Sequence, residues 1–378
     1  MRDGTAVTTA EAWKTKRAPE LRALFQHYMY GARPTAPAVT GKLIHEDKAA
    51  LGGKATLREV EVSIGLDTPV RLLIVTPNDA KKPVPCFLGM NFSGNFRLLD
   101  DPKIAPPRWA PNAAAASDVN RGKERATWAI EQCIARGYAV ANFHSGDVVP
   151  DDKAAAETVL KKLRAGDAAE RGPADTATIM AWAWGFSRMV DHLLTVPEIA
   201  GARIAAVGHS RNGKTALLAA AFDERIALAI PSQAGCGGTA PNRISSPNPG
   251  ARPAAETVAI INKNFPHWFS GNFKAFSGAV EKLPFDQHCL IALCAPRPVL
   301  LSNAEQDAWA NPDGQFDMLR AAAPVYALLG EKIALPAQRP ALDSLLNERL
   351  GYFIRPGKHS MTTPDWNVWL DYADKWLK

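Results

Sequence analysis

The chain has 378 residues, of which 47% are hydrophobic and 22% are charged, a composition typical of ordinary globular proteins. No apolar run approaches the roughly 18 residues needed to cross a bilayer, which argues against a membrane-spanning protein. The 44 basic and 38 acidic residues leave a net charge of +6. Because the basic residues are scattered and form no nucleic-acid-binding motif, we expect neither a nucleic-acid nor a membrane partner.

Strand and helix signals alternate along the chain. The first 37 residues predict a helix around Leu21–Phe25, followed by a loop. Apolar or alternating runs predict strands at 58–64, 70–75, 84–92, 138–143, 205–207, 226–230, 298–302 and 350–354, and helical spacing predicts helices at 128–135, 176–194, 211–220 and 365–377. We expect loop insertions at about 150–175 and 239–284. This alternation predicts one α/β domain over residues 1–378, a doubly wound three-layer sandwich with a mainly parallel central sheet.

Cysteine usage indicates thiols rather than a disulfide framework. The chain contains Cys86, Cys133, Cys236, Cys289 and Cys294. Their number is odd and most have apolar neighbours, so we predict buried free thiols. The absence of a Cys-x-x-Cys pair or a His/Cys cluster leads us to expect no metal. Residues 1–4 lack the apolar core of an export signal.

The most informative local pattern is the segment 208–214, Gly-His-Ser-Arg-Asn-Gly-Lys. An apolar strand enters it and a helix of small residues leaves it. This layout lifts a serine hydroxyl clear of a sheet for nucleophilic attack, although the spacing is G-x-S-x-x-G and not the common G-x-S-x-G. We therefore predict that Ser210 is a catalytic nucleophile.

The order of residues along the chain selects its partners. In enzymes that share this strand–turn–helix motif, the α/β-hydrolases, the acid and then the histidine follow the nucleophile. His359 lies in a Pro-Gly loop after the last predicted strand, so we predict that it is the general base. We assign His288 either a structural role or a role in supporting the residues of the site. In the loop after strand 298–302, both Asp307 and Glu305 qualify as the acid. We favour Asp307, because the turn residues 311–314 can fix its loop.

Two cations lie next to the predicted nucleophile. The backbone N–H of Arg211 opens a helix and can donate to an oxyanion. Its guanidinium either adds a charged donor or pairs with a neighbouring carboxylate and orders the turn. Lys214 lies one helical turn after Ser210, so it can face the same cleft.

Ordered blocks over most of the chain resemble the glucuronoyl esterases of carbohydrate esterase family 15, and bacterial members in particular. The blocks are the elbow at 208–214 and residues 89–95, 235–238, 256–258, 265–269, 283–288, 295–298 and 307–312. The resemblance implies an α/β-hydrolase fold and a serine esterase without a cofactor. It further implies hydrolysis, through an acyl-enzyme, of esters between glucuronic acid on xylan and lignin alcohols. The alternative is an acetyl-xylan esterase or a general carboxylesterase. By analogy we expect a secreted or periplasmic monomer.

The resemblance also assigns roles to residues. It implies that Ser210 and His359 perform the chemistry and that Arg211 serves the oxyanion. The expected substrate-binding residues are Lys214, Glu256, Trp309, Gln233 and Trp268.

Two departures from the family pattern affect the site. Gln233 stands where many members carry a catalytic glutamate, which strengthens the prediction that Asp307 is the acid. His209 replaces the cysteine that precedes the serine in fungal members, so we expect no disulfide there and a free Cys236.

Overall fold

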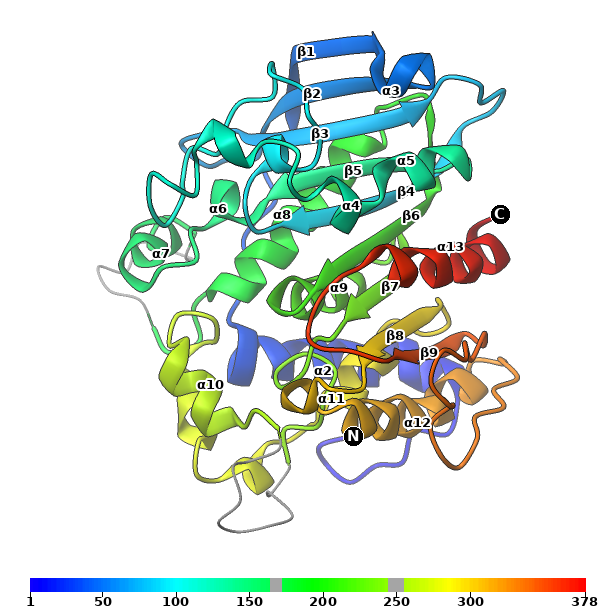
Figure 1. The fold of residues 1–378 in the computed structure, drawn as a ribbon. Helices are drawn as coiled ribbons and strands as arrows, with labels where there is room; N and C mark the ends of the chain where they lie inside the picture. Colours follow the sequence, from blue (N-terminus) through cyan, green and yellow to red (C-terminus); the bar gives the residue numbers. More distant parts are fainter. Residues whose placement is uncertain (164–171, 244–254) are drawn as a thin grey trace.

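A single mixed sheet forms the centre of the molecule. The computed structural model describes residues 1–163, 172–243 and 255–378, so parts of both expected insertions, 164–171 and 244–254, lie outside it. Within the described residues the strand order is β1-β2-β3-β5-β4-β6-β7-β8-β9 (Figure 1). The strands are β1 (Thr40–Ala49), β2 (Ala55–Ser63), β3 (Val70–Pro77), β4 (Val84–Asn91), β5 (Ala139–His144), β6 (Ile199–His209), β7 (Ile226–Ser232), β8 (Val299–Ala304) and β9 (Leu350–Arg355). Strands β4 to β9 run parallel, and β3, β2 and β1 continue the sheet as antiparallel neighbours. The predicted mainly parallel sheet is confirmed.

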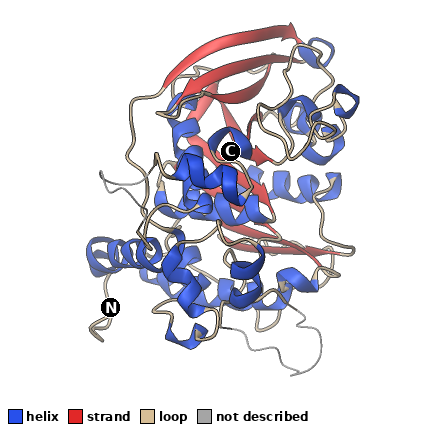
Figure 2. Ribbon diagram, turned by 90° about the vertical axis from the view of Figure 1, so that its left-hand side faces the viewer, coloured by secondary structure: helices blue, strands red, loops and turns tan. Residues whose placement is uncertain are grey.

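Helices cover both faces of this sheet (Figures 1 and 2). They are α1 (Ala10–Ala12), α2 (Ala18–Phe25), α3 (Ala50–Gly53), α4 (Arg125–Trp128), α5 (Ile130–Ala135), α6 (Ser145–Val148), α7 (Lys153–Leu160), α8 (Thr178–Leu193), α9 (Arg211–Phe222), α10 (Val258–Asn264), α11 (Gln287–Ala292), α12 (Pro312–Leu328) and α13 (Thr363–Leu377). Alternate residues of β6 serve the two layers: Ile204 and Ala206 pack in the core with α8 and α9, whereas Ala205 and Val207 pack in the core with α5 and α13. Such alternation is what a strand covered on both faces requires. The three-layer α/β fold is therefore as predicted.

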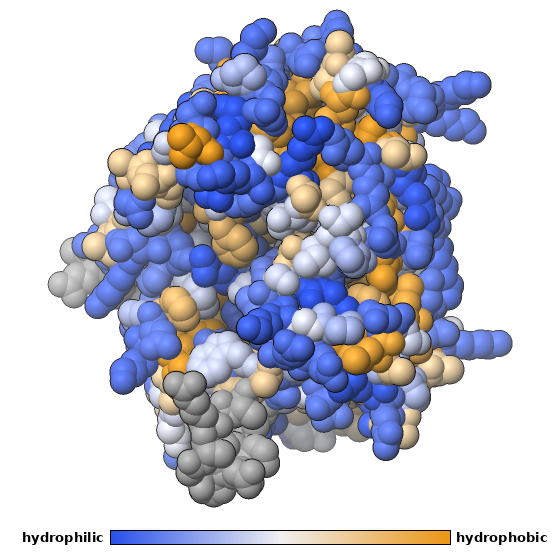
Figure 3. Space-filling view, in the orientation of Figure 1, coloured by the Kyte–Doolittle hydropathy of each residue, from blue (hydrophilic) through white to orange (hydrophobic). Residues whose placement is uncertain are grey.

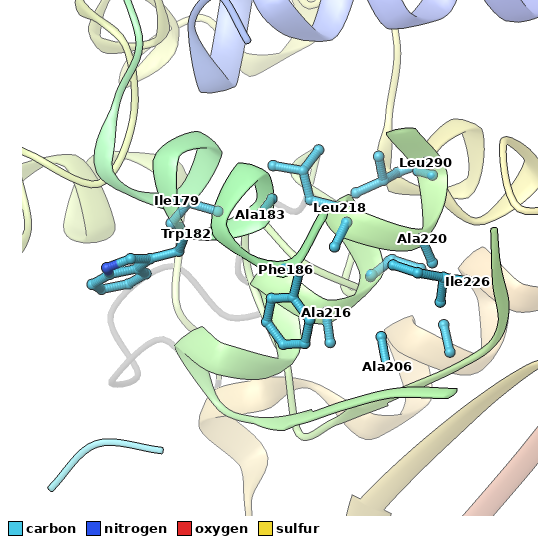
Figure 4. Close-up of a cluster of buried hydrophobic side chains, with 14 of the residues drawn as sticks. Ile179, Trp182, Ala183, Phe186, Ala206, Ala216, Leu218, Ala220, Ile226 and Leu290 are labelled. Carbon is cyan, nitrogen blue, oxygen red and sulfur yellow. The ribbon is translucent and has the colours of Figure 1, made fainter. Parts of the chain in front are cut away.

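A buried apolar cluster fixes the helix that follows Ser210. In Figure 4, Phe186 of α8 lies beside Ala216 of α9, whereas Ala220 of α9 lies nearer Ile226 of β7. The alanines allow α9 to approach both α8 and the sheet closely, because they carry no side chain beyond Cβ. The direction in which the start of α9 points is thus set by the core.

The outer surface is largely polar. Figure 3 shows that hydrophilic residues cover most of one face, with apolar residues in scattered patches. The described part of the chain contains no helix that is both long and apolar enough to cross a bilayer.

Several elements differ from the sequence predictions, and three of the differences have a plain physical reason. β1 lies in a stretch for which we predicted no element; it is the outer strand and mostly exposed, so it lacks an alternating pattern. The helix predicted at 128–135 is two short helices, because Ala129 adopts a left-handed φ of 45° between them. The predicted turn at 311–314 is the start of the long helix α12: the Asn311 side chain caps it by accepting from the Gly314 N–H (3.0 Å), and Pro312 occupies its first turn.

Candidate active site

Ser210 occupies a tight turn between β6 and α9. Its φ of 58° and ψ of −126° are strained for a residue with a side chain, and its backbone N–H donates to the Ser232 carbonyl (2.9 Å). The flanking glycines are needed: a Cβ on Gly208 would lie 2.2 Å from the Asn212 carbonyl oxygen, and one on Gly213 would lie 2.8 Å from that of Ser232. This is the strand–elbow–helix geometry that presents a nucleophile at the carboxyl edge of a sheet.

The loops after β8 and β9 bring an acid to a histidine. Nδ1 of His359 lies 2.6 Å from Oδ2 of Asp307. The Asp307 side chain is buried, and its Oδ1 accepts a bond from the Ala310 N–H (3.3 Å). Glu305, the other candidate acid, is exposed. Of the two carboxylates that the sequence offered, Asp307 is the one that meets the imidazole.

The residue before Ser210 also contacts this histidine. The rings of His209 and His359 lie 4.4 Å apart, centroid to centroid, at 43°. Burial, followed by the neighbouring charges of His359, Arg355 and Arg211, lowers the pKa of His209 to about 3. His209 is therefore neutral near pH 7 and packs against the second imidazole without sharing its charge. No disulfide forms here: Cys236 and the other four cysteines are buried free thiols, as predicted.

Arg211 is held by a carboxylate that the sequence analysis did not identify. Its Nε lies 2.7 Å from Oδ2 of Asp151, and its guanidinium lies over Phe92 and near Trp268, 4.7 and 5.6 Å from the ring centroids. Oδ1 of Asp151 accepts bonds from Nε2 of His267 (2.9 Å) and Nε1 of Trp268 (2.7 Å). Burial alone raises the pKa of Asp151, but these bonds and the charge of Arg211 outweigh it and hold the pKa below its usual range. A third of the Arg211 side chain stays exposed (32%).

Lys214, Glu256 and Trp309 come together on the β7–β8 side of the elbow. Nζ of Lys214 donates to the carbonyls of Ala234 (2.6 Å) and Cys236 (2.7 Å) and lies 3.8 Å from Oε2 of Glu256. Burial lowers the pKa of Lys214 and raises that of Glu256. The Glu256 N–H donates to the Trp309 carbonyl (3.0 Å), and the Trp309 side chain is 45% exposed. The structure thus places one exposed indole beside a buried ion pair.

The other two residues expected to bind substrate are buried. Trp268 stacks on Phe265 with ring centroids 3.7 Å apart, and the Arg211 guanidinium lies 5.6 Å from the centroid of its ring. Gln233 is 1% exposed, and its amide binds the backbone of Ser360. His288 lies in α11, where its Nε2 is 3.4 Å from the Cys289 thiol.

Three parts of the site were missed: Asp151, the contact between His209 and His359, and the bonds to Ser360. The one sequence signal that pointed to Asp151 was the need of Arg211 for a partner carboxylate. Among the residues that the structure describes, no group of three or more His, Cys, Asp or Glu is placed to hold a metal ion. A half-buried serine at the edge of the sheet, an imidazole oriented by a buried acid and a cation at the start of a helix are the parts that nucleophilic acyl transfer uses.

Known proteins are similar to this chain in sequence and in structure. A family model described as glucuronyl esterase, fungi, matches residues 129–330. A carbohydrate esterase from an unknown prokaryotic organism is 40% identical over an alignment of 388 positions, which covers 99% of this chain and 87% of the relative. A 4-O-methyl-glucuronoyl methylesterase of Wolfiporia cocos is 30% identical over 338 residues, which cover 87% of this chain and 70% of the relative.

Solved structures agree with these matches. A glucuronoyl esterase from Solibacter usitatus superimposes with a TM-score of 0.91 at 33% identity, covering 100% of this chain and 96% of that one. A structure described as a promiscuous esterase of carbohydrate esterase family 15, from the marine bacterial metagenome, gives 0.88 at 38% identity and covers 100% and 95%. The chain therefore belongs to the glucuronoyl esterases of carbohydrate esterase family 15, has the α/β-hydrolase fold, and is a carboxylic ester hydrolase.

Proposed function

We propose that the protein hydrolyses glucuronoyl esters, which link glucuronic acid on xylan to lignin alcohols, through an acyl-enzyme on Ser210. The observation that carries the proposal is the 2.6 Å contact between Asp307 and His359. Both residues lie on loops that begin at the carboxyl edge of the sheet, where the serine elbow also lies. Membership of the glucuronoyl esterase family supports the acyl group, and relatives named 4-O-methyl-glucuronoyl methylesterases support it further.

The orientation of the imidazole supports the first chemical step. Because an ionised carboxylate only accepts hydrogen bonds, Nδ1 of His359 carries the proton and Nε2 carries a lone pair. Nε2 takes the proton of Ser210 while the serine oxygen attacks the ester carbonyl carbon, and Asp307 stabilises the imidazolium that forms. The imidazolium then protonates the departing alcohol. In the second half, His359 takes a proton from water while the water oxygen attacks the acyl carbon. The bond between the acyl carbon and the Ser210 oxygen then breaks, the imidazolium returns its proton to that oxygen, and the glucuronic acid leaves.

Arg211 is suited to stabilise the oxyanion of both tetrahedral intermediates. Its backbone N–H lies at the start of the 12-residue helix α9, where unpaired N–H groups and the helix dipole favour negative charge. Its guanidinium is held in place by Asp151 and remains partly exposed. Preorganised donors of this kind are effective because they need no rearrangement as charge develops.

The group of Lys214, Glu256 and Trp309 is suited to hold the sugar of the acyl group. Lys214 holds the Glu256 carboxylate, which offers an acceptor for sugar hydroxyls, and the exposed Trp309 offers a flat apolar face. We propose that these residues select a glucuronoyl group over smaller acyl groups. Because the polymers that carry such esters lie outside cells, we propose that the enzyme is secreted or periplasmic.

A broader esterase activity is the second candidate, since one relative of 38% identity is described as promiscuous. The test compares kcat/KM for benzyl glucuronate with that for an aryl acetate. We expect a clear preference for the glucuronate in the wild type. A preference for acetate would reject the glucuronoyl assignment and favour a general carboxylesterase or an acetyl-xylan esterase.

A further inference from the structure

Gln233 binds both backbone polar groups of the residue that follows His359. Its Nε2 donates to the Ser360 carbonyl (2.7 Å), and its Oε1 accepts from the Ser360 N–H (3.0 Å). That N–H belongs to the peptide bond between His359 and Ser360. A neutral amide is required for this pair of bonds, because a carboxylate at the same place accepts but cannot donate.

The backbone of Gln233 is itself fixed to the strand that leads to the acid. Its N–H donates to the Ser302 carbonyl on β8 (2.8 Å), and its φ of 48° turns the chain sharply after β7. β8 continues into the loop of Asp307. Gln233 therefore connects the strand that carries Asp307 to the loop that carries His359.

The two bonds are not equally replaceable. The Ser360 carbonyl also accepts from Nη2 of Arg355 (2.7 Å), whose Nε binds Asp365 (2.8 Å) at the start of α13. The bond from the Ser360 N–H goes to Gln233. Loss of the Gln233 amide thus leaves a partly buried N–H without its acceptor, next to the histidine, while the carbonyl keeps one donor.

The geometry does not fit our expectation that Gln233 binds substrate, because the side chain is 1% exposed and both of its polar atoms are used within the protein. We propose instead that Gln233 is a positioning residue, a neutral clasp that holds the His359 loop so that the imidazole stays aligned on Asp307. This inference rests on the proposed role of His359 as the general base.

The test uses Gln233→Met, which keeps the length of the side chain but forms neither bond, and Gln233→Glu, which keeps the acceptor but lacks the donor. We expect kcat for benzyl glucuronate to fall by about 10- to 100-fold in Gln233→Met, as for a small misplacement of a catalytic group. KM should change little, because the sugar contacts are untouched. Turnover of an aryl acetate should fall by a similar factor. We expect kcat of Gln233→Glu to fall too, since its carboxylate faces the Ser360 carbonyl oxygen.

A spectroscopic readout separates positioning from general stability. In ¹⁵N-histidine-labelled Ser210→Ala protein, the downfield Nδ1–H proton of His359, assigned by its loss in His359→Gln, reports the bond to Asp307 without any turnover. We expect Gln233→Met to broaden or remove this signal while the circular dichroism spectrum stays native. Gln287→Met is the matched control: Gln287 is also a buried glutamine that donates to a backbone carbonyl, that of Gly238 (2.6 Å), but it does not bind the His359 loop. It should lower Tm and leave the signal unchanged.

The outcomes distinguish this inference from the proposed function. An unchanged signal and wild-type kcat in Gln233→Met, or turnover of Gln233→Glu at or above the wild-type level, would overturn the positioning role. A wild-type protein that hydrolyses neither ester but shows a signal dependent on Gln233 would overturn the proposed function and leave the clasp in place.

Discussion

Asp307 and His359 meet at 2.6 Å although 52 positions separate them in the chain. They follow β8 and β9, which are adjacent parallel strands. The carboxyl ends of such strands lie at one edge of the sheet, so each strand delivers one member of the pair. The contact fixes which imidazole nitrogen carries the proton and therefore which one is free to act as a base.

The first prediction concerns the acid. We expect Asp307→Asn to lower kcat for benzyl glucuronate by about 10³- to 10⁴-fold, because an amide neither enforces the Nδ1–H tautomer nor stabilises an imidazolium by charge. Gln233→Ala should cost far less, about 10- to 100-fold, since the acid remains in place. Steady-state kinetics of the two variants give the comparison. Equal losses would show that Asp307 is not the catalytic acid.

The second prediction concerns Asp151 and Arg211. We expect Arg211→Ala to lower kcat by about 10²- to 10³-fold through the loss of an oxyanion donor. Asp151→Asn should lower kcat by about 10-fold, because the guanidinium loses the carboxylate that holds its Nε but keeps its charge. If Asp151 acts through Arg211, the double variant Asp151→Asn/Arg211→Ala should be no slower than Arg211→Ala alone. Losses that multiply in the double variant would contradict this link.

The third prediction concerns Lys214. Replacement by Met removes the bonds to the carbonyls of Ala234 and Cys236 and leaves Glu256 without its cation. We expect the free energy of unfolding to fall by about 2 to 4 kcal/mol, as when one partner of a buried pair is removed. KM for benzyl glucuronate should rise more than KM for an aryl acetate. Lys42→Met, on the exposed strand β1, is the control and should change neither quantity. A parallel rise in both KM values would argue against a sugar-binding role.

The fourth prediction concerns Glu59, which is buried in β2 away from the elbow. Burial raises its pKa from 4.5 to about 7, although the charge of Arg71 opposes this. The folded state binds the Glu59 proton more tightly than the unfolded state does. Protonated Glu59 therefore adds its full contribution to the free energy of unfolding below pH 4.5, and this contribution is lost as the pH rises through about 7. Glu59→Gln lacks this loss, which is worth about 3 kcal/mol at pH 8. The difference in Tm between Glu59→Gln and the wild type should therefore become more positive from pH 5 to pH 8. A difference that is the same at both values would contradict it.

The parts of the site that could be predicted from the sequence depend on local patterns. The elbow around Ser210 combines an apolar strand, flanking glycines and a helix of small residues, all within one short segment. His359 and Asp307 each follow an apolar strand, so the rule that parallel strands end at one edge was enough to bring them together.

The parts that could not be predicted depend on contacts across the fold. Asp151 and Asp152 are neighbours in one polar stretch, yet Asp151 holds Arg211, whereas Asp152 caps α7 by accepting from the N–H groups of Ala154 and Ala155. No local signal separates the two. In the same way, the sequence shows that Gln233 replaces a glutamate, but its bonds to Ser360 depend on a loop 127 positions away.

The most direct measurement is the turnover of benzyl glucuronate by Ser210→Ala, made beside its circular dichroism spectrum and its binding of glucuronic acid by calorimetry. We expect a folded protein that still binds the sugar acid but whose kcat has fallen by about 10⁴-fold or more, because the nucleophile is gone. Turnover near the wild-type level in folded Ser210→Ala would show that the ester is not cleaved through Ser210.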